Sequence, residues 1–267
     1  MDRNSRCRSW LLAFVAALGV LCGDRCAFVA RPLSATAQDK KAAAPKVLYA
    51  VPLVVKPGEK QKLALRGKNL DAVKDVKVSG ADGATVTFVA AKKVGVPNNY
   101  PGERVGDSEV EIELDLPKDA KAVTLTVAGP GGESAYKPLV ADDTPAVKEK
   151  EPNDGFGQAQ RIPIPSAVDG TIQTERDTDV FRFDGKKGEK LRIEVVAAKY
   201  GSPVDAMIVL YDAGRRVIDS ADDAAGSSDP SLGVTLPADG AYYLSVLDAH
   251  DLGGPNFGYR LVVARAK

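Results

Sequence analysis

The chain of 267 residues carries 36 Lys and Arg against 36 Asp and Glu, a formal net charge of zero. The first 37 residues contain five Arg and two Asp, so 31 basic and 34 acidic residues follow them, a net charge of −3. This balance gives no electrostatic footprint for nucleic acid or for an anionic lipid surface. Neither nucleic acid nor a membrane surface is therefore the expected partner.

The N-terminus has the pattern of an export signal. Three arginines precede an apolar run from Trp10 to Cys22, which is shorter than the roughly 20 residues that span a bilayer. Ala35-Thr36-Ala37 offers a cleavage site, so residues 1–37 are predicted to be a cleavable signal peptide with no membrane span after cleavage. The alternatives are an earlier cut after Ala27 or Ala30, acylation at Cys22 or Cys26, and a leader retained as an anchor. We expect a secreted, periplasmic or cell-envelope protein.

All three cysteines lie in this predicted leader, at Cys7, Cys22 and Cys26. If the leader is removed, the mature protein has no thiol. That excludes disulfides, thiol catalysis and cysteine-ligated zinc, and the domains must be held together by their cores.

After a tether at residues 38–45, residues 46–141 are predicted to form an immunoglobulin-like β-sandwich. Residues 109–114 alternate acidic and apolar side chains, and the other runs are short, β-branched and separated by turn residues. Around seven such strands in about 100 residues are typical of the immunoglobulin-like fold. Residues 93–107 are interpreted as a solvated loop, with ligand contact as the alternative. The predicted strands are 47–55, 62–65, 73–78, 85–90, 109–114, 123–127 and one near Leu139.

Val55-Lys56-Pro57-Gly58, followed by Leu63-Ala64-Leu65-Arg66-Gly67-Lys68-Asn69-Leu70, resembles the opening of the IPT/TIG class of immunoglobulin-like domains. Residues 129–134 resemble the late glycine turn of that class. The resemblance implies an interaction or spacer module rather than an enzyme.

Residues 142–150 are charged, contain a proline and are poor in apolar residues, so they are predicted to be an interdomain linker. Residues 151–267 have no long segment of helical period, and only residues 153–160 are a candidate for a short helical turn. They are predicted to form a second sandwich of about eight strands, a jelly roll. The predicted strands are 168–172, 180–184, 191–197, 207–211, 216–220, 232–236, 242–247 and 259–264.

Residues 149–264 resemble the bacterial pre-peptidase C-terminal (PPC) domain. The resemblance is carried, in order, by Glu151-Pro152-Asn153-Asp154, Gly170-Thr171-Ile172, Asp177-Thr178-Asp179-Val180-Phe181-Arg182-Phe183, Leu210-Tyr211-Asp212, Leu236-Pro237-Ala238-Asp239-Gly240 and Gly258-Tyr259. It implies a non-catalytic β-sandwich of the kind appended to secreted peptidases. In some clostridial collagenases a related domain binds calcium and collagen.

Two acidic segments, residues 149–154 and 177–179, place carboxylate and amide oxygens on either side of one predicted strand start. Oxygen ligands at this density suit a hard cation. The resemblance implies that the cation is calcium and that its ligands are Glu149, Glu151, Asn153, Asp154, Asp177 and Asp179. Asp177 fits less well, because the collagenase pattern spaces its aspartate pair more widely. The alternative is structural: Asn153 and Asp154 cap a turn, and Asp179 caps the start of a strand.

Few features of the sequence support a catalytic function. A Ser/His/Asp triad would have to use His250, the single histidine, which lies in a loop rich in Gly, Pro and Asp. No G-x-S-x-G elbow, P-loop, dinucleotide fingerprint or zinc motif occurs. Residues 222–223 and 227–229 are read as a hairpin connection, with a second cation site as the alternative. The chain also lacks, after residue 246, the exposed aromatics that collagen-binding relatives carry.

The sequence therefore predicts a secreted, non-enzymatic binding or scaffolding protein with a calcium-dependent linker site. Because Glu149 and Glu151 border the linker, calcium would fix the angle between the sandwiches. The expected partner is an extracellular protein or polysaccharide. One alternative is a carbohydrate-binding accessory protein that acts beside a separate secreted hydrolase, and a weaker one is a hydrolase that depends on His250.

Overall fold

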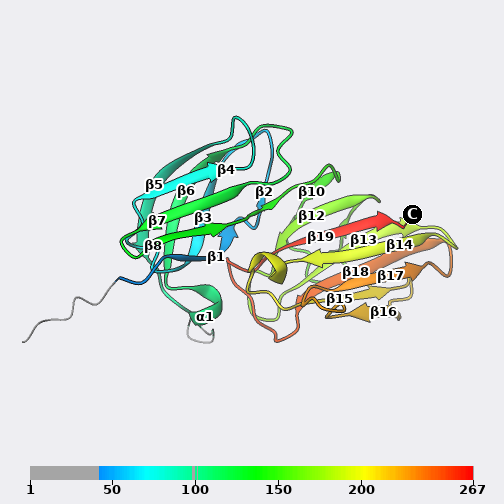
Figure 1. The fold of residues 1–267 in the computed structure, drawn as a ribbon. Helices are drawn as coiled ribbons and strands as arrows, with labels where there is room; N and C mark the ends of the chain where they lie inside the picture. Colours follow the sequence, from blue (N-terminus) through cyan, green and yellow to red (C-terminus); the bar gives the residue numbers. More distant parts are fainter. Residues whose placement is uncertain (1–41, 98–99, 101, 267) are drawn as a thin grey trace, which may run out of the picture. The chain divides into compact units, whose positions relative to one another are not determined.

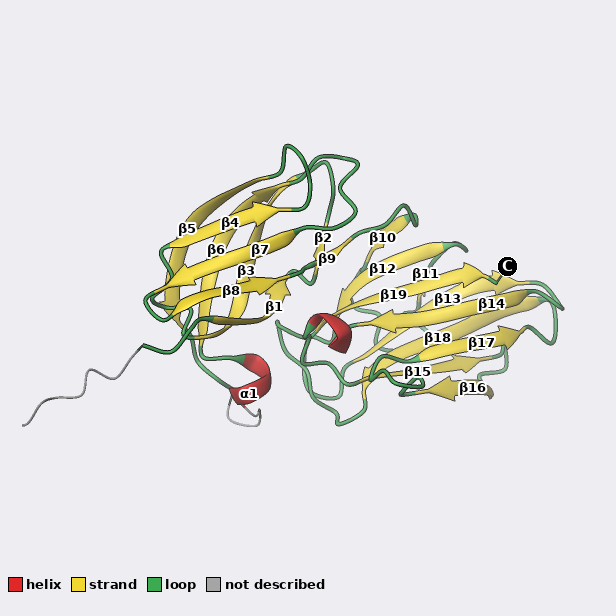
Figure 2. Cartoon of the chain, viewed as in Figure 1, coloured by secondary structure: helices red, strands yellow, loops and turns green. Residues whose placement is uncertain are grey.

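The computed structural model describes residues 42–97, 100 and 102–266, which fold almost entirely into strands (Figures 1 and 2). Among these residues the helices are limited to α1 (Gly102–Val105) and η1 (Ala198–Tyr200). No helix in this part of the chain is long and apolar enough to cross a membrane. The predicted all-β fold is confirmed, and the predicted signal peptide lies outside the described residues.

The first sandwich contains the strands β1 (Lys46–Val51), β2 (Val54–Val55), β3 (Lys60–Lys68), β4 (Asp75–Ser79), β5 (Thr85–Lys93), β6 (Ser108–Asp115), β7 (Thr124–Gly129), β8 (Gly132–Tyr136) and β9 (Leu139–Val140). One sheet has the order β1-β3-β6-β5 and the other has the order β4-β7-β8, while β2 and β9 form a short parallel pair. The alternation predicted for residues 109–114 holds, because Val110, Ile112 and Leu114 are buried and the intervening glutamates reach the surface. Pro52 divides the predicted strand 47–55 into β1 and β2, since proline has no N–H for a ladder.

The second sandwich contains the strands β10 (Ala146–Lys148), β11 (Gln160–Arg161), β12 (Ser166–Thr171), β13 (Thr178–Gly185), β14 (Lys190–Val196), β15 (Ala206–Tyr211), β16 (Val217–Ala221), β17 (Ser231–Thr235), β18 (Gly240–Asp248) and β19 (Gly258–Arg265). Its two sheets have the orders β10-β12-β19-β14-β17 and β11-β13-β18-β15-β16. Without β10 and β11, this is the strand order of a jelly roll, as predicted. The two additional strands pair in parallel with β12 and β13.

The core of the second sandwich lies between these two sheets. On β13, Phe181 and Phe183 are fully buried and point the same way, as the period of two requires. Phe183 stacks on Tyr242 of β18 with ring centroids 5.7 Å apart. Burial of each such aromatic side chain contributes roughly 1.5–3 kcal/mol. This rigid body holds the ends of β12, β13 and β19 in fixed positions.

Two segments differ from their predictions. Residues 146–148, inside the predicted linker, form β10 and join the sheet of the second sandwich. Residues 153–160 do not form a helical turn but follow an irregular path with a turn at Gly155. Two glycines in this segment disfavour a helix, and Phe156 is held by edge-to-face contacts with Tyr211 and Tyr243 instead.

Some of the described residues in the predicted solvated loop 93–107 are packed: Val105 is buried and Tyr100 is half-buried, whereas residues 95–97 are exposed. Tyr100 packs edge-to-face on Phe257, with centroids 4.9 Å apart, and its hydroxyl donates to the carbonyl of Gly253 at 3.1 Å. Arg104 of α1 donates to the carbonyl of Pro203 at 3.3 Å. These are contacts within one compact unit of residues 41–267. The segment therefore has a packing role.

The free edge of β10 is covered by one side chain. The amide of Gln160 donates to the carbonyl oxygen of Lys148 at 2.8 Å and accepts the N–H of Lys150 at 2.7 Å. The side-chain amide thus makes the two hydrogen bonds that a neighbouring peptide group would make.

Candidate metal centre

Two segments distant in sequence bring carboxylates together in the second sandwich, and a third contributes a tyrosine hydroxyl. Glu149 and Glu151 directly follow β10, and Asp179 lies near the start of β13. One carboxylate oxygen of each of these three residues lies within 4.8 Å of the other two. Tyr259 of β19 reaches the same point, since its hydroxyl oxygen is 2.8 Å from Glu149 Oε1 and 2.6 Å from Asp179 Oδ2. We refer to Glu149, Glu151, Asn153, Asp179 and Tyr259 as the carboxylate cluster.

Burial increases toward the centre of the carboxylate cluster. Asp179 and Asn153 are fully buried and Tyr259 is 1% exposed, whereas Glu149 is half-buried and Glu151 is exposed. A hydroxyl has a single proton, so Tyr259 cannot donate to both carboxylates at once. The second short contact requires a proton on one carboxyl group or a cation shared by both oxygens.

Every acid of the carboxylate cluster resists ionisation. Burial, and secondly the charge of Glu149, raises the pKa of Asp179 to about 9. Burial also raises the pKa of Glu149 and of Glu151. Burial beside two carboxylates raises the pKa of Tyr259 well above its usual value. In the absence of a cation, the folded protein therefore holds a proton here at neutral pH.

Basic side chains do not neutralise this charge. In the described part of the chain, no Lys, Arg or His nitrogen lies within 4.0 Å of a carboxylate oxygen of Glu149, Glu151 or Asp179. Buried charges are normally paired or coordinate a metal ion. The carboxylate cluster thus has the composition of a cation site rather than of an ion-pair network.

The side-chain amide of Asn153 faces two of the carboxylates. With its nitrogen inward, the amide donates to Glu151 Oε2 at 2.9 Å and to Asp179 Oδ1 at 3.0 Å. A half-turn of the same amide places its oxygen at that position. Two oxygens bound to one calcium ion at roughly 2.4 Å are themselves about 3 Å apart. The Asn153 amide can therefore fit both states of the carboxylate cluster. Its nitrogen points inward when the carboxylates hold a proton, and its oxygen points inward when they bind calcium.

Gly170 on β12 makes room for the carboxylate cluster. It pairs with Tyr259 across the β12–β19 ladder. A Cβ atom at Gly170 would lie 2.3 Å from Glu149 Oε1 and 2.4 Å from Tyr259 Cζ, closer than real Cβ contacts. The N–H of the next residue, Thr171, donates to Glu149 Oε2 at 2.9 Å. Glycine at this position is what lets Glu149 and the tyrosine ring meet.

The six predicted ligands fall into three groups. Glu149, Glu151, Asn153 and Asp179 converge. Asp177 lies beside them and its charge raises the pKa of Glu151, but its Oδ2 accepts the backbone N–H of Gln173 at 2.5 Å. Asp154 is exposed. The side chains of Asn153 and Asp179 contact other members of the carboxylate cluster, which differs from the turn-capping alternative.

Sequence reasoning did not identify Tyr259 as a member of the carboxylate cluster and named it only among the residues that carry the resemblance to PPC domains. Its hydroxyl bonds to Glu149 and Asp179, which are 110 and 80 residues away in sequence. The one sequence signal was the pair of glycines in Gly170-Thr171 and Gly258-Tyr259, because a glycine opposite a tyrosine leaves space beside the ring.

His250 and Asp229, the other candidate site residues, contact neighbouring residues in ways that indicate neither a catalytic triad nor a cation site. His250 is largely exposed, and its Nδ1 lies 3.1 Å from Asp205 Oδ2 rather than beside a hydroxyl nucleophile. Asp229, a candidate for a second cation site, uses both carboxylate oxygens to accept the backbone N–H groups of Ala197, Ala198 and Lys199. It therefore fixes the start of η1.

Comparisons with known proteins bear on the second sandwich. Residues 177–247 match the family model of the bacterial pre-peptidase C-terminal domain. A stretch of 109 residues, 40% of the chain, is 35% identical to a probable subtilase-type serine protease of Deinococcus radiodurans. The chain spans only 15% of the length of that relative.

Similar solved structures are more distant in sequence. The pre-peptidase C-terminal domain of a collagenase from Bacillus anthracis is 20% identical with a TM-score of 0.34, over 43% of this chain and 99% of that one. PliG of Aeromonas hydrophila, a periplasmic inhibitor of g-type lysozyme, is 19% identical with a TM-score of 0.31, over 47% of this chain and 100% of that one. PPC domains are non-catalytic modules, which fits a non-enzymatic role for the second sandwich. The match of residues 177–247 to the bacterial pre-peptidase C-terminal domain confirms the resemblance read from the sequence for this part of the second sandwich.

Proposed function

We propose that this chain is a secreted, non-catalytic binding or scaffolding protein whose second sandwich binds one calcium ion at the carboxylate cluster. The observation that carries the proposal is the convergence of Glu149, Glu151 and Asp179 within 4.8 Å without a basic neighbour. The expected location is outside the cell or in the cell envelope, and the expected partner is an extracellular protein or polysaccharide.

The ligand set favours calcium over smaller ions. Three carboxylates and the oxygen of Asn153 supply at least four oxygens, and waters at the exposed Glu151 side complete the six to eight that calcium takes. Magnesium requires near-octahedral geometry at roughly 2.0–2.1 Å, whereas the longer and more flexible coordination of calcium suits a mixed set of carboxylate, amide and water oxygens. Asp177 lies close enough to add charge, while Asp154 remains in solvent.

Calcium at this position would have a mechanical role. β10 is already part of the sheet, so the stretch that calcium would further stabilise is the short segment from Glu149 to Asn153. A shared ion would fasten that segment to Asp179 on β13. It would also replace the proton that the buried carboxylates otherwise hold, because a divalent cation favours their ionised forms.

The test is a calorimetric titration with calcium after treatment with EDTA, with magnesium in parallel. One ion per chain should bind. Calcium at a hundredfold excess over Kd should raise the free energy of unfolding by about 3 kcal/mol, which appears as a higher melting temperature. The variant Glu151→Gln with Asp179→Asn should bind at least about 100-fold more weakly, because two charged ligands are lost. Asp223→Asn, in an exposed loop, is the matched control and should bind as the wild type does.

Absence of heat, together with unchanged melting in excess calcium, would refute the calcium proposal and leave a purely structural cluster. The partner needs a separate measurement. Saturable binding on a glycan array would support the alternative of a carbohydrate-binding accessory protein, and capture of an extracellular matrix protein with no glycan binding would support the scaffolding role.

A further inference from the structure

The chain contains five Asp-Gly pairs, in which the carboxyl group of the aspartate can react with the backbone nitrogen of the glycine. Glycine has no Cβ, so the nitrogen is unshielded and the backbone rotates more freely than at other residues. The reaction closes a succinimide ring, which water reopens to aspartate or to isoaspartate. The pairs are Asp82-Gly83, Asp154-Gly155, Asp169-Gly170, Asp184-Gly185 and Asp239-Gly240.

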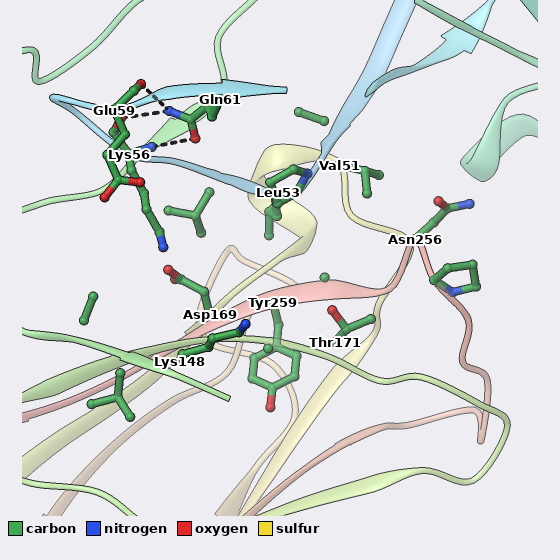
Figure 3. A pocket seen from close by; sticks show the side chains of 18 residues that line it. Val51, Leu53, Lys56, Glu59, Gln61, Lys148, Asp169, Thr171, Asn256 and Tyr259 are labelled. Carbon is green, nitrogen blue, oxygen red and sulfur yellow. Dashed lines mark hydrogen bonds between the residues drawn. The ribbon is translucent and has the colours of Figure 1, made fainter. Parts of the chain in front are cut away.

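Three of the five pairs are held in place by the fold. Asp169-Gly170 lies in the β12–β19 ladder, and its carboxylate, which borders the cavity in Figure 3, accepts a hydrogen bond from Arg260 at 2.5 Å. Asp184-Gly185 lies in the β13–β18 ladder, and its carboxylate forms an ion pair with an arginine of β11. Asp239-Gly240 leads into β18, and its carboxylate accepts the N–H of Lys187 at 2.7 Å. In each of these pairs the carboxylate must leave a partner before the ring can close.

Asp154-Gly155 has none of these restraints and lies outside every strand. Asp154 is exposed, and its carboxylate makes no hydrogen bond or ion pair with any residue that the structure describes. The N–H of Gly155 has no acceptor among the same residues, and nothing lies within 4 Å of the position that a Cβ atom would take there. The carboxyl carbon of Asp154 can therefore approach the nitrogen without the loss of another contact.

Asp82-Gly83, in the turn between β4 and β5, is open to the same degree. Both residues are exposed, and nothing lies within 4 Å of the Cβ position of Gly83. Because this pair belongs to the first sandwich, it is an internal reference for how fast an open pair reacts.

The position of Asp154-Gly155 connects it to the carboxylate cluster. On one side, the carbonyl oxygen of Asn153 accepts the N–H of Val180 on β13 at 2.9 Å. On the other side, Phe156 makes edge-to-face contacts with tyrosines of β15 and β18, with centroids 5.1 and 5.2 Å apart. Isoaspartate lengthens the main chain by one carbon atom between these two fixed points. At least one of the two contacts must then change.

We propose that Asp154 is a site of spontaneous isomerisation, and that its conversion to isoaspartate displaces Asn153 from the carboxylate cluster. The nitrogen of Gly155 bonds to Cγ of Asp154, and a carboxyl oxygen leaves as water with the amide hydrogen and the carboxyl proton. Water then adds to the main-chain carbonyl carbon of Asp154 and breaks its bond to the nitrogen. The product has a free α-carboxylate and a peptide bond through Cγ. One water is released and one is consumed, so the reaction requires no oxidant and no other co-reactant.

The test is prolonged warm incubation of the full chain at neutral pH, followed by tryptic digestion and separation of the peptides. Aspartate and isoaspartate peptides have equal mass but different retention times, and water enriched in heavy oxygen labels each ring that reopens. We expect isoaspartate at residues 154 and 82. The three held pairs should convert at least about tenfold more slowly, because each must lose about one net hydrogen bond before the ring closes.

Two variants isolate the reaction at residue 154. Asp154→Glu keeps the charge but would have to form a larger, less favourable ring. Gly155→Ala places a methyl group beside the nitrogen, in a position where the structure has open space. Both variants should form much less of the isomerised product at residue 154, while residue 82 converts as in the wild type.

The isomerised chain, purified by chromatography, should melt at a lower temperature in EDTA than the unmodified chain, and it should bind calcium more weakly. The calcium comparison alone rests on the proposed calcium site, whereas the amount of isoaspartate is independent of it. Absence of isoaspartate at residue 154, or equal conversion of all five pairs, would overturn the proposal. Equal melting temperatures of the isomerised and unmodified chains would overturn the link to the carboxylate cluster.

Discussion

The acidic side chains on β6 of the first sandwich and those of the carboxylate cluster in the second have opposite surroundings. In the first, glutamates on β6 face lysines on the neighbouring strands: Lys60 lies 2.7 Å from Glu113, and Lys92 lies 2.6 Å from Glu111. Lys92 lowers the pKa of Glu111 through a hydrogen bond and its charge. In the second, burial raises the pKa of Asp179 to about 9, and its neighbours are further acids.

The difference shows what an acidic residue contributes in each place. Paired carboxylates on an exposed sheet face are neutralised by their cross-strand neighbours, so they add solubility and little stability. Buried carboxylates without a basic partner require a proton or a cation, and this makes their environment responsive to both. The raised pKa values of Glu149, Glu151 and Asp179 therefore accompany burial without a basic partner.

The largest effect is expected from pH in the absence of calcium. The folded-state pKa of Asp179 is raised above its unfolded value, so the folded chain binds an extra proton between about pH 4 and pH 9. Stability should be greatest at the acidic end of that window and fall as pH rises through it, by about 4 kcal/mol between pH 5 and pH 8. Thermal unfolding in EDTA, followed by circular dichroism, measures this. Asp179→Asn should flatten the profile, and parallel profiles for the two proteins would contradict the prediction.

A smaller effect is expected from Gly170→Ala. The added methyl group has no space beside Glu149 Oε1 and Tyr259, so the variant should lose about 1–3 kcal/mol and bind calcium more weakly. Gly233→Ala on β17 is the matched control, since nothing lies within 4 Å of its Cβ position, and it should be neutral or slightly stabilising. Urea unfolding compares the two. Equal stability of the two variants would show that the carboxylate cluster tolerates expansion.

The smallest effect is expected from Lys92→Met on the exposed face of the first sandwich. Lys92 is 52% exposed on its side chain, and its partner Glu111 remains in contact with solvent, which can solvate the freed carboxylate. The melting temperature should change less than for Gly170→Ala. Any difference from the wild type should vanish in about 1 M NaCl, where charges are screened beyond about 3 Å. A large decrease in melting temperature that does not depend on salt would mean that the ion pairs on this face also stabilise the fold.

Strands with a clear period of two were predictable, because one face of each is buried. β6, β13 and β18 lie where the alternation of apolar residues places them. The short strands β10 and β11 were not predicted, since residues 146–148 and 160–161 carry no apolar pattern of their own. Their pairing with β12 and β13 comes from tertiary contacts, which override local propensity in such short segments.

Part of the candidate site was likewise predictable from the sequence, and part was not. The density of oxygens at residues 149–154 and 177–179 was visible in the sequence, and resemblance to a known domain named the candidate ligands. Which of the six predicted ligands converge depends on backbone geometry, which the sequence pattern does not specify. Asp177 is turned toward the N–H of Gln173, and Asp154 faces solvent. Membership of Tyr259 depends on the register of β12 against β19, which no local pattern specifies.

The side-chain amide of Gln160 has a consequence for how this protein behaves among copies of itself. An outermost strand with open backbone groups is a template on which another chain can add a strand and begin an aggregate. Gln160 already occupies the partners at Lys148 and Lys150, so an incoming strand would first have to displace it. A single glutamine thereby protects this end of β10 against the addition of a further strand.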